Sequence, residues 1–420
     1  MGLVNKSNKF STMKLIGPFS QLATLDNLPL RGALSDEQLN LQEGMGILIS
    51  EGYIEETGDL DALVEKADEV QRIPEGHVCI PSFVDCHTHI CFAGSRAKDF
   101  SMRNAGKSYL QIAAEGGGIW STVENTRKAS GQDLVEGLKS RIEQLLRQGV
   151  TTVEVKSGYG LNYTDEIKML RAIHTAQNTV SSDIISTCLA AHMKPKDFEE
   201  SSERYLNYVL EEILTAVREE NLSRRVDVFI EKSAFGIEES RAFLQKARIL
   251  GFDITVHADQ FTSGSARLAA ELGAKSADHL EVLTDEDVAF LASSQTVAVA
   301  LPGASLGLGE PFAPARKILD ANGILAIASD WNPGSAPMGN LLAQASILAT
   351  YQKLTTPELL SALTFRAAFA LGLEDRGRLQ KGMRADFQIY KADSIYEIPY
   401  RQGELKPCAV YILGTRAYGT

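Results

Sequence analysis

Short apolar runs alternate with segments of helical periodicity from about residue 79 to residue 330. Most of the runs are rich in Val, Ile, Thr and Ala, and such stretches are typical of strands buried on both faces of a parallel sheet. The eight runs are 79–89, 151–156, 185–192, 226–231, 252–257, 276–281, 296–302 and 323–330. Between them, apolar residues recur at the three- and four-residue spacing of an amphipathic helix. The predicted helices include 132–148, 164–176, 204–217, 239–249, 264–272, 285–293 and 314–321.

Eight strands that alternate with helices over about 250 residues predict an α/β fold, the (β/α)8 barrel of the TIM type. An open, doubly wound sheet is the alternative. That fold lacks its usual signature here, because no Gly-x-Gly-x-x-Gly sequence follows a predicted strand. The glycine run 116–118 falls between the first two strands. We interpret it as a loop over the barrel mouth, with phosphate binding as the weaker alternative.

The two ends of the chain have a different pattern. Residues 14–78 and 380–420 contain short β-like runs, such as 46–49, 386–390 and 409–413, with turn residues between them. We therefore predict a small β-sandwich-like domain formed by residues 1–78 together with 380–420. The barrel domain then comprises residues 79–379.

The composition is that of an ordinary globular protein. Of 420 residues, 44% are hydrophobic and 23% are charged, which excludes a disordered, collagen-like or coiled-coil chain. The net charge of 42 − 54 = −12 argues against binding nucleic acid through a broad basic surface. A small-molecule partner is therefore expected.

The cysteines and the N-terminus indicate a reducing compartment. The number of cysteines is odd and no Cys-x-x-Cys pair occurs, so buried free thiols are expected rather than disulfides or a cysteine-built zinc site. The cysteines are Cys79, Cys86, Cys91, Cys188 and Cys408.

Residues 1–12 are predicted to be a polar extension, and no apolar run approaches the ~18 residues of a membrane span. A cytoplasmic protein is expected.

Histidines gather at the ends of the predicted strands. Five of the seven stand at the carboxyl end of a strand, which in a barrel is the face where active sites are assembled. These are His87, His89, His192, His257 and His279. His87 and His89 are two residues apart and so point to the same side of their strand. Asp330 ends the eighth run, whereas His77 and His174 are interpreted as structural.

Several imidazoles and a carboxylate at one barrel end suit a metal such as zinc or iron. Such an ion would lower the pKa of a bound water from ~16 towards ~7 and so supply a nucleophile at neutral pH. A lone histidine on an apolar strand, or an isolated His-x-His pair, is often incidental. The prediction therefore rests on the coincidence of five histidines and one aspartate.

Longer segments then resemble a known family. The segment PSFVDCHTH (81–89), with His257, His279 and Asp330 on later strands, resembles the amidohydrolase superfamily. Further segments resemble its imidazolonepropionase family, which opens the imidazolone ring in histidine degradation. They are FAGSRAKDFSMRNAGKSYLQIAAEGGGIWSTVENTRKAS (92–130), TTVEVKSGYGLNYTDEIKML (151–170), HADQ (257–260), ADHLE (277–281), LPGAS (301–305) and SDWNPGSAP (329–337). The resemblance covers essentially the whole chain.

The resemblance implies a reaction and a role for each matching residue. The reaction is the hydrolysis of 4-imidazolone-5-propanoate to N-formimidoyl-L-glutamate, in a homodimer. One zinc or iron ion (Zn²⁺, Fe²⁺ or Fe³⁺) would be held by His87, His89, His257 and Asp330. His279 would transfer protons beside the attacking water, whose proton Asp330 takes. The implied substrate contacts are Arg96, Tyr159, His192, Gln260, Asn332, Gly334 and Ser335.

The chemistry of these residues agrees with a small anionic substrate. Arg96 can bind a carboxylate through two N–H groups, and Tyr159 can donate a further hydrogen bond. Gly158 and Gly160 would let the backbone approach a ligand closely. The alternatives are a surface ion pair for Arg96 and a packed loop aromatic for Tyr159.

Three positions qualify the resemblance. Gln260 stands where some family members carry Glu, so the acid–base work is expected of His279 and Asp330. Trp331 stands where Phe is common, with little expected consequence. Lys156 ends the second strand and suggests a carbamylated lysine that bridges two metals. In such relatives the lysine is on the fourth strand, where this chain has Glu231, so we predict one metal and a supporting role for Lys156.

Two other functions remain open from the sequence. The first is a related amidohydrolase, a deaminase or cyclic amidase that acts on another small heterocycle. The second is a non-catalytic barrel that serves as a binding or scaffolding subunit. Such a protein is expected to have lost a metal ligand, whereas all four are present here.

Overall fold

The structure is a computed structural model that describes residues 12–419, without the side chains at positions 109, 110 and 113. The polar extension predicted for residues 1–12 lies outside the described part, except for Thr12. Within residues 12–419, no helix is both long and apolar enough to cross a membrane.

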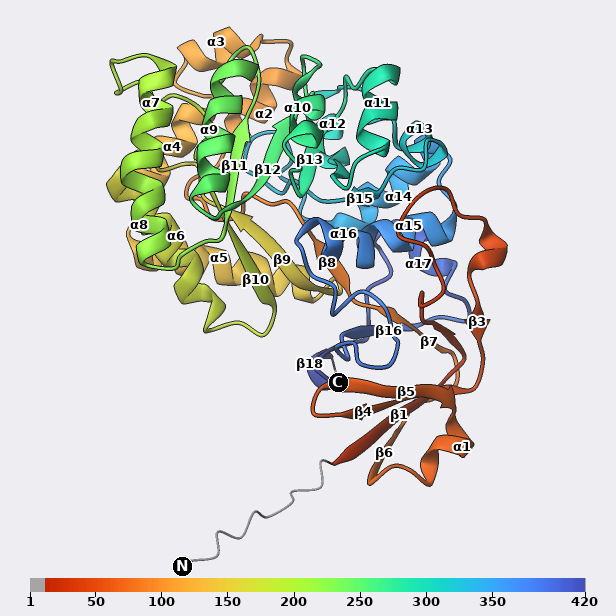
Figure 1. Ribbon diagram of the computed structural model, residues 1–420. Coiled ribbons are helices and arrows are strands. Elements are labelled where there is room, and N and C mark those ends of the chain that lie inside the picture. Colours follow the sequence, from red (N-terminus) through yellow and green to blue (C-terminus); the bar gives the residue numbers. More distant parts are fainter. Residues whose placement is uncertain (1–11, 420) are drawn as a thin grey trace, which may run out of the picture.

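Eight parallel strands form a barrel in which each strand pairs with its neighbours in chain order (Figure 1). They are β8 (Phe83–Asp85), β9 (Val150–Lys156), β10 (Asp183–Ala191), β11 (Arg225–Phe229), β12 (Asp253–Ala258), β13 (Ser276–His279), β14 (Val297–Ala300) and β15 (Leu325–Ile327). The predicted barrel is confirmed, and the strand order is not that of a doubly wound sheet.

Backbone hydrogen bonds beyond the ends of β15 and β8 bring the last strand to the first. The Asp330 amide donates to the His87 carbonyl at 3.0 Å, and the His89 amide donates to the Trp331 carbonyl at 3.0 Å. The first and last predicted metal ligands therefore lie side by side across the seam of the barrel.

The prediction that residues 79–89 form a single strand was wrong. The segment divides at Ser82 into β7 (His77–Pro81), which pairs with β16 (Phe387–Lys391) outside the barrel, and β8, which opens the barrel. Proline lacks the backbone N–H that a strand needs, so Pro81 suits the point where one sheet is left for another. The domain boundaries stay a prediction.

Helices surround the barrel and cover its outer face (Figure 1). Six of them match predicted helices closely: α5 (Gly131–Leu146), α6 (Tyr163–Gln177), α9 (Ile237–Ile249), α10 (Ser265–Glu271), α11 (Asp285–Ala292) and α13 (Ala315–Asp320). The helix predicted at 204–217 contains a π-helical turn, Val209–Ile213, between α7 (Ser202–Tyr208) and α8 (Leu214–Glu219). The other helices around the barrel are α2 (Ala97–Asn104), α3 (Tyr109–Ala114), α4 (Ile119–Lys128), α12 (Pro302–Leu308), α14 (Leu341–Gln352), α15 (Thr356–Leu363) and α16 (Phe365–Ala370).

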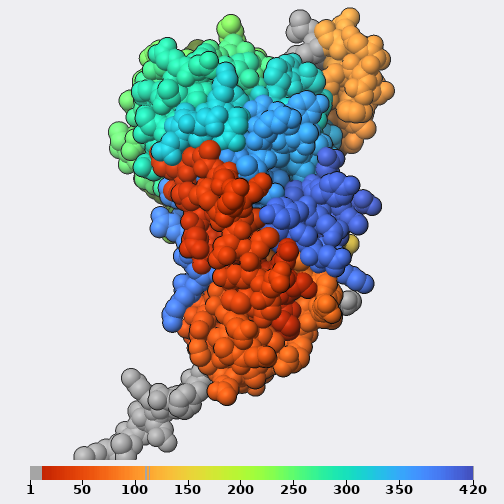
Figure 2. Space-filling model, turned by 90° about the vertical axis from the view of Figure 1, so that its right-hand side faces the viewer, coloured from red at the N-terminus to blue at the C-terminus, as the bar shows by residue number. Residues whose placement is uncertain are grey.

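Two sheets from the chain ends lie beside the barrel. The four-stranded sheet has the order β5 (Tyr53–Asp59), β4 (Met45–Ser50), β1 (Met13–Phe19) and β6 (Glu69–Arg72), and α1 (Leu60–Val64) packs on it. The six-stranded sheet has the order β18 (Thr415–Gly419), β17 (Ala409–Ile412), β16, β7, β2 (Gln21–Ala23) and β3 (Leu41–Gln42). The short helix α17 (Glu397–Tyr400) follows β16. Figure 2 shows N-terminal segments in red beside C-terminal segments in dark blue.

Separate apolar clusters support the two parts. The largest lies between barrel strands and helices and includes Val153 of β9 and Leu138 of α5. Another joins the two end sheets, with Ile16 of β1 packed in one cluster with Phe387 of β16. The end sheets thus share a core, as a β-sandwich does.

Candidate active site

One cavity of about 510 Å³ collects most of the predicted site residues. It is lined by His89, Arg96, Tyr159, His192, His257, Gln260, His279, Asp330, Asn332, Gly334 and Ser335. Each of these residues lies in or after the carboxyl-terminal half of its strand, or in the loops that follow. Of the predicted site residues, His87 alone does not line the cavity, because it is fully buried behind the wall.

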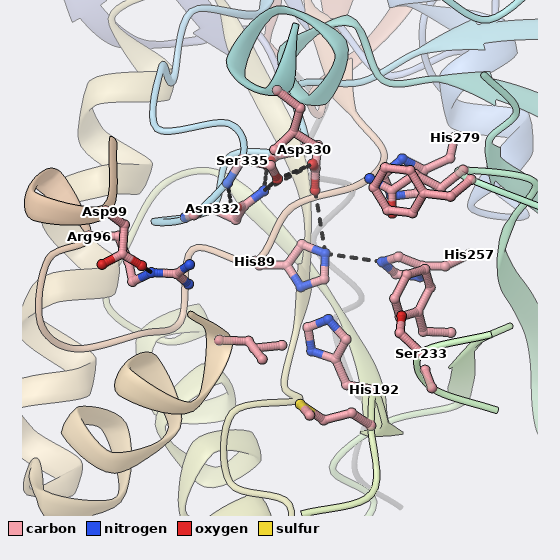
Figure 3. A pocket seen from close by; sticks show the side chains of 18 of the residues that line it. His89, Arg96, Asp99, His192, Ser233, His257, His279, Asp330, Asn332 and Ser335 are labelled. Carbon is pink, nitrogen blue, oxygen red and sulfur yellow. Dashed lines mark hydrogen bonds and ion pairs between the residues drawn. The ribbon is translucent and has the colours of Figure 1, made fainter. Parts of the chain in front are cut away.

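The predicted metal ligands lie around His89. His87, His89 and Asp330 present ligand atoms within 4.8 Å of one another, and a second such group joins His87 and His257 to His279. His89 Nε2 lies 3.2 Å from the Nε2 atoms of both His87 and His257. Asp330 Oδ1 lies 3.6 Å from His87 Nε2 and 3.5 Å from His89 Nε2. Ligands placed tetrahedrally at the 2.0–2.2 Å usual for zinc are themselves about 3.3–3.6 Å apart. Figure 3 shows His89 between Asp330 and His257.

Two buried aspartates fix the orientation of the histidines. His87 Nδ1 lies 2.7 Å from Asp278 Oδ2, and His257 Nδ1 lies 2.9 Å from Asp227 Oδ2. A ring whose Nδ1–H donates to a carboxylate presents the lone pair of Nε2 on its other side. Both lone pairs therefore face His89.

The protonation states suit a bound cation. Burial lowers the pKa of His87 and His89 well below the usual value, and it lowers the pKa of His257 to about 4. Neutral imidazoles whose Nε2 atoms are only 3.2 Å apart bring lone pairs together, which a shared cation would stabilise. The donor set of three nitrogens and one carboxylate oxygen thus fits zinc or iron.

Asp330 and His279 line the same cavity, and both have a positive φ angle, which is unfavourable for residues other than glycine. Their φ angles are +49° and +90°, a conformation that costs about 1–3 kcal/mol at such residues. Burial raises the pKa of Asp330 to about 7. Burial alone would lower the pKa of His279, but the Glu281 carboxylate, 3.2 Å from Nδ1, raises it above the usual value. Both groups can therefore exchange protons near neutral pH.

Asn332 holds the Asp330 carboxylate in place. Its Nδ2 donates to Asp330 Oδ2 at 2.9 Å and to the Asp330 carbonyl at 2.7 Å. Its Oδ1 accepts the backbone N–H groups of Gly334 and Ser335, each at 2.8 Å. With its amide engaged in this way, we interpret Asn332 as a positioning residue first.

Lys156 belongs to a buried ionic network behind the metal site. Its Nζ lies 2.8 Å from Glu154 Oε1 and 2.9 Å from Asp227 Oδ2, and the lysine is 1% exposed. Asp227 in turn holds His257, so Lys156 acts on a metal ligand through one carboxylate. Glu231 follows β11 and accepts the backbone N–H groups of Phe261 and Thr262, each at 3.0 Å. It therefore ties two loops together.

Arg96 lies across the cavity from His257 and His279 (Figure 3). Its Nε donates to Asp99, and its Nη1 lies 3.5 Å from Thr122 Oγ1. A Cβ atom at Gly334 would come within 3.1 Å of Arg96 Nη1, so glycine leaves room for the guanidinium group. The same Asp99 carboxylate accepts the backbone N–H of Gly118 at 2.8 Å. The glycine run at 116–118 thus packs beside Arg96.

His192 stacks on His89 in the cavity wall, with ring centroids 5.4 Å apart. Its Nδ1 lies 3.0 Å from the Gly158 carbonyl, and burial lowers its pKa to about 3, so Nε2 is an acceptor. Gly158 and Gly160 are required by the packing of the protein itself, and the expectation that they let a ligand approach the backbone stays a prediction. A Cβ atom at Gly158 would lie 2.9 Å from the Leu189 carbonyl, and one at Gly160 would lie 2.4 Å from the Glu166 nitrogen.

Three residues that the sequence analysis considered lie outside the cavity wall. His174 is exposed on α6, and neither Lys156 nor Glu231 lines the cavity. All five cysteines are free thiols, but Cys408 is exposed, which corrects the expectation that they are buried.

Sequence reasoning missed the carboxylates that support the site. Asp227, Asp278 and Glu281 were not singled out, although each is a buried acid in or next to an apolar strand. A buried carboxylate is costly unless it is paired, and this was an available signal. Arg103 and Lys107, which also line the cavity, lie in the long segment between β8 and β9.

Comparison with known proteins identifies the family. Residues 115–399 match the model of the amidohydrolase family. The chain is 38% identical to the imidazolonepropionase of Clostridium tetani, over 91% of this chain and 93% of that protein. It is 39% identical to the imidazolonepropionase of Bdellovibrio bacteriovorus, over 97% of both chains.

A solved structure agrees on the fold. A zinc-bound adenosine deaminase from Xanthomonas campestris superposes with a TM-score of 0.68 at 18% identity, over 97% of this chain and 92% of that one. The sequence matches are much closer and extend over nearly the full length. The chain belongs to the imidazolonepropionase family of the amidohydrolases.

Proposed function

We propose that the chain hydrolyses the cyclic amide of 4-imidazolone-5-propanoate and so forms N-formimidoyl-L-glutamate. The observation that carries this proposal is the convergence of three imidazole nitrogens and Asp330 Oδ1 at one end of a cavity that has Arg96 opposite. Relatives at 38–39% identity carry the name of this activity. A deaminase or cyclic amidase for another heterocycle is not favoured by these relatives.

His87, His89, His257 and Asp330 would hold one zinc or iron ion. An ion in this position supplies a Lewis acid that activates water and polarises a carbonyl. The zinc in the related deaminase structure supports zinc, while the nitrogen-rich donor set also suits ferrous iron. The choice between the two is a matter for metal analysis.

Asp330 and His279 are the proton-transfer groups. Asp330, with its raised pKa, accepts the proton of the attacking water. His279 donates a hydrogen bond to the oxygen that gains negative charge at the ring carbonyl, because its own pKa is raised by Glu281. Either group can then protonate the ring nitrogen as the C–N bond breaks, so no other acid is needed.

The cavity offers complementary partners to the rest of the substrate. His192 Nε2 can accept a hydrogen bond from a ring N–H. Burial raises the pKa of Tyr159, which keeps its hydroxyl a donor. The guanidinium group of Arg96 and the Tyr159 hydroxyl suit the carboxylate of the propanoate arm. Gln260 and Ser335 line the same cavity.

The binding partner, the compartment and the oligomeric state are proposed from the sequence. The small anionic substrate is the expected partner, and the negative net charge argues against nucleic acid. The five free thiols support a reducing compartment such as the cytoplasm. The homodimer remains a proposal from the resemblance.

The activity is tested with freshly generated imidazolone propanoate and the purified chain. Mass spectrometry should detect N-formimidoyl-glutamate at a rate proportional to enzyme concentration. The same assay with an imidazolone that lacks the propanoate arm should give much slower conversion. Equal rates on both compounds, or no ring opening of either, would refute the proposed substrate.

A further inference from the structure

Arg103 of α2 lines the cavity without a hydrogen-bond or ion-pair partner among the described residues. Arg103 follows Arg96 by seven residues, two helical turns along the same face of the segment. Its Nε and Nη2 atoms are buried, and neither has a hydrogen-bond partner among the described residues. Arg103 also lines the cavity that contains the metal ligands.

Other buried arginines with an unpaired nitrogen differ from Arg103. Arg225, Arg366 and Arg384 each bind the protein through another guanidinium nitrogen, to Ala370, Gly32 and Asp386 respectively. Arg103 makes no such hydrogen bond to the atoms that the structure describes, and its guanidinium carbon lies 5.8 Å from the centre of the Phe100 ring. A buried guanidinium N–H without an acceptor is costly, so we expect a water or an anion to accept a hydrogen bond from it.

Of the three cations on this side of the cavity, Arg103 is the one that forms no ion pair with a described residue. Arg96 forms an ion pair with Asp99, and Lys107 forms one with Glu115. Glu310, on another wall, is exposed to solvent, which screens its charge. Burial and the positive charge of Arg96 lower the pKa of Arg103, and the Asp99 carboxylate offsets only part of this effect.

We propose that Arg103 and Arg96 together bind the carboxylate of the substrate, and that Arg103 supplies the positive charge that selects an anionic ligand. This inference rests on the proposed function. Asp99 neutralises the charge of Arg96. The guanidinium group of Arg96 can therefore donate hydrogen bonds to a substrate carboxylate, but the Arg96–Asp99 pair attracts its negative charge only weakly. Arg103 adds unpaired N–H donors, which form stronger hydrogen bonds to a carboxylate than to a neutral group.

The test compares an acidic ligand with its neutral counterpart. Binding of imidazolepropanoate and of imidazolepropanamide is measured by calorimetry for wild type, Arg103→Gln and Arg103→Met. Arg147→Gln is the matched control, because Arg147 is an exposed arginine beyond the C-terminus of α5 and removes the same charge. Arg103 makes no hydrogen bond to the part of the chain that the structure describes, so both of its variants should fold.

Wild type and Arg147→Gln should prefer the propanoate, and both Arg103 variants should lose about tenfold or more of this preference. An unchanged preference in Arg103→Gln and Arg103→Met would overturn the assignment. The measurement needs no turnover, so it is independent of ring opening. If wild type opened no imidazolone ring but Arg103→Gln lost the preference, the proposed function would fail while Arg103 remained a carboxylate-binding residue.

Discussion

His87 Nδ1 lies 2.7 Å from Asp278 Oδ2, although 191 residues separate the two along the chain. The first barrel strand supplies the histidine and the sixth supplies the aspartate, so the contact exists only in the closed barrel. The carboxylate holds the ring so that Nε2 faces His89 and Asp330. The fold therefore sets both the position and the tautomer of a predicted metal ligand.

Replacing Asp278 with alanine should weaken metal binding by about 10- to 100-fold, because His87 loses the acceptor that orients it. The affinity is measured by competition with a chromogenic chelator. Asp253→Ala removes an exposed aspartate at the start of β12 and should leave the affinity unchanged. Wild-type affinity in Asp278→Ala would show that the contact does not support the site.

Replacing Lys156 with methionine should lower the free energy of unfolding by about 3–5 kcal/mol, because Glu154 and Asp227 lose their buried counter-ion. Urea denaturation measures this loss. Lys168→Met removes a partly exposed lysine paired with Asp165 and should cost at most about 1 kcal/mol. Similar losses in the two variants would contradict the supporting role of Lys156.

Replacing Gly117 with alanine should raise KM by about tenfold with kcat nearly unchanged. The new Cβ atom would lie 2.6 Å from Asp99 Oδ1, so it would displace the carboxylate that orients Arg96 without changing the charge of the cavity. Steady-state kinetics on imidazolone propanoate separate the two constants. A fall in kcat alone would argue against this positioning role.

Replacing His279 with alanine should leave about one metal ion per chain while lowering turnover by about 10²- to 10⁴-fold. His279 is proposed to transfer protons and is not one of the four predicted metal ligands, so its loss should affect turnover and not metal binding. Metal analysis and the ring-opening assay are made on the same preparation. His174→Ala, which removes an exposed histidine of α6, should behave as wild type. Unchanged turnover in His279→Ala would remove it from the mechanism.

The sequence predicted the strand-end residues well because a polar side chain after an apolar strand has few places to point. His87 and His89 share one side of a strand by simple alternation, and Asp330 ends the last strand of a closed barrel. The barrel and its parallel order followed from the same pattern. The division of the first strand at Ser82 was missed, since β7 and β8 are almost continuous and equally apolar.

The supporting residues could not be derived from the pattern. Asp227 meets His257 between the neighbouring strands β11 and β12, whereas Asp278 of β13 meets His87 across the barrel. Neither pairing can be read from the order of residues along the chain. Arg103 lies in the segment between β8 and β9, which has no strand periodicity to fix where its side chains lie. The packing role of Gly158 and Gly160 was also missed, because the atoms that exclude a side chain there come from other parts of the fold.

The most direct test of the account is the metal content of the purified chain, measured together with ring opening before and after chelation. The account predicts about one zinc or iron ion per chain, loss of ring opening when the ion is removed, and recovery when it is restored. His89→Ala should bind the ion poorly, because His89 Nε2 lies next to the other two imidazoles. Undiminished ring opening by protein freed of metal would contradict the account.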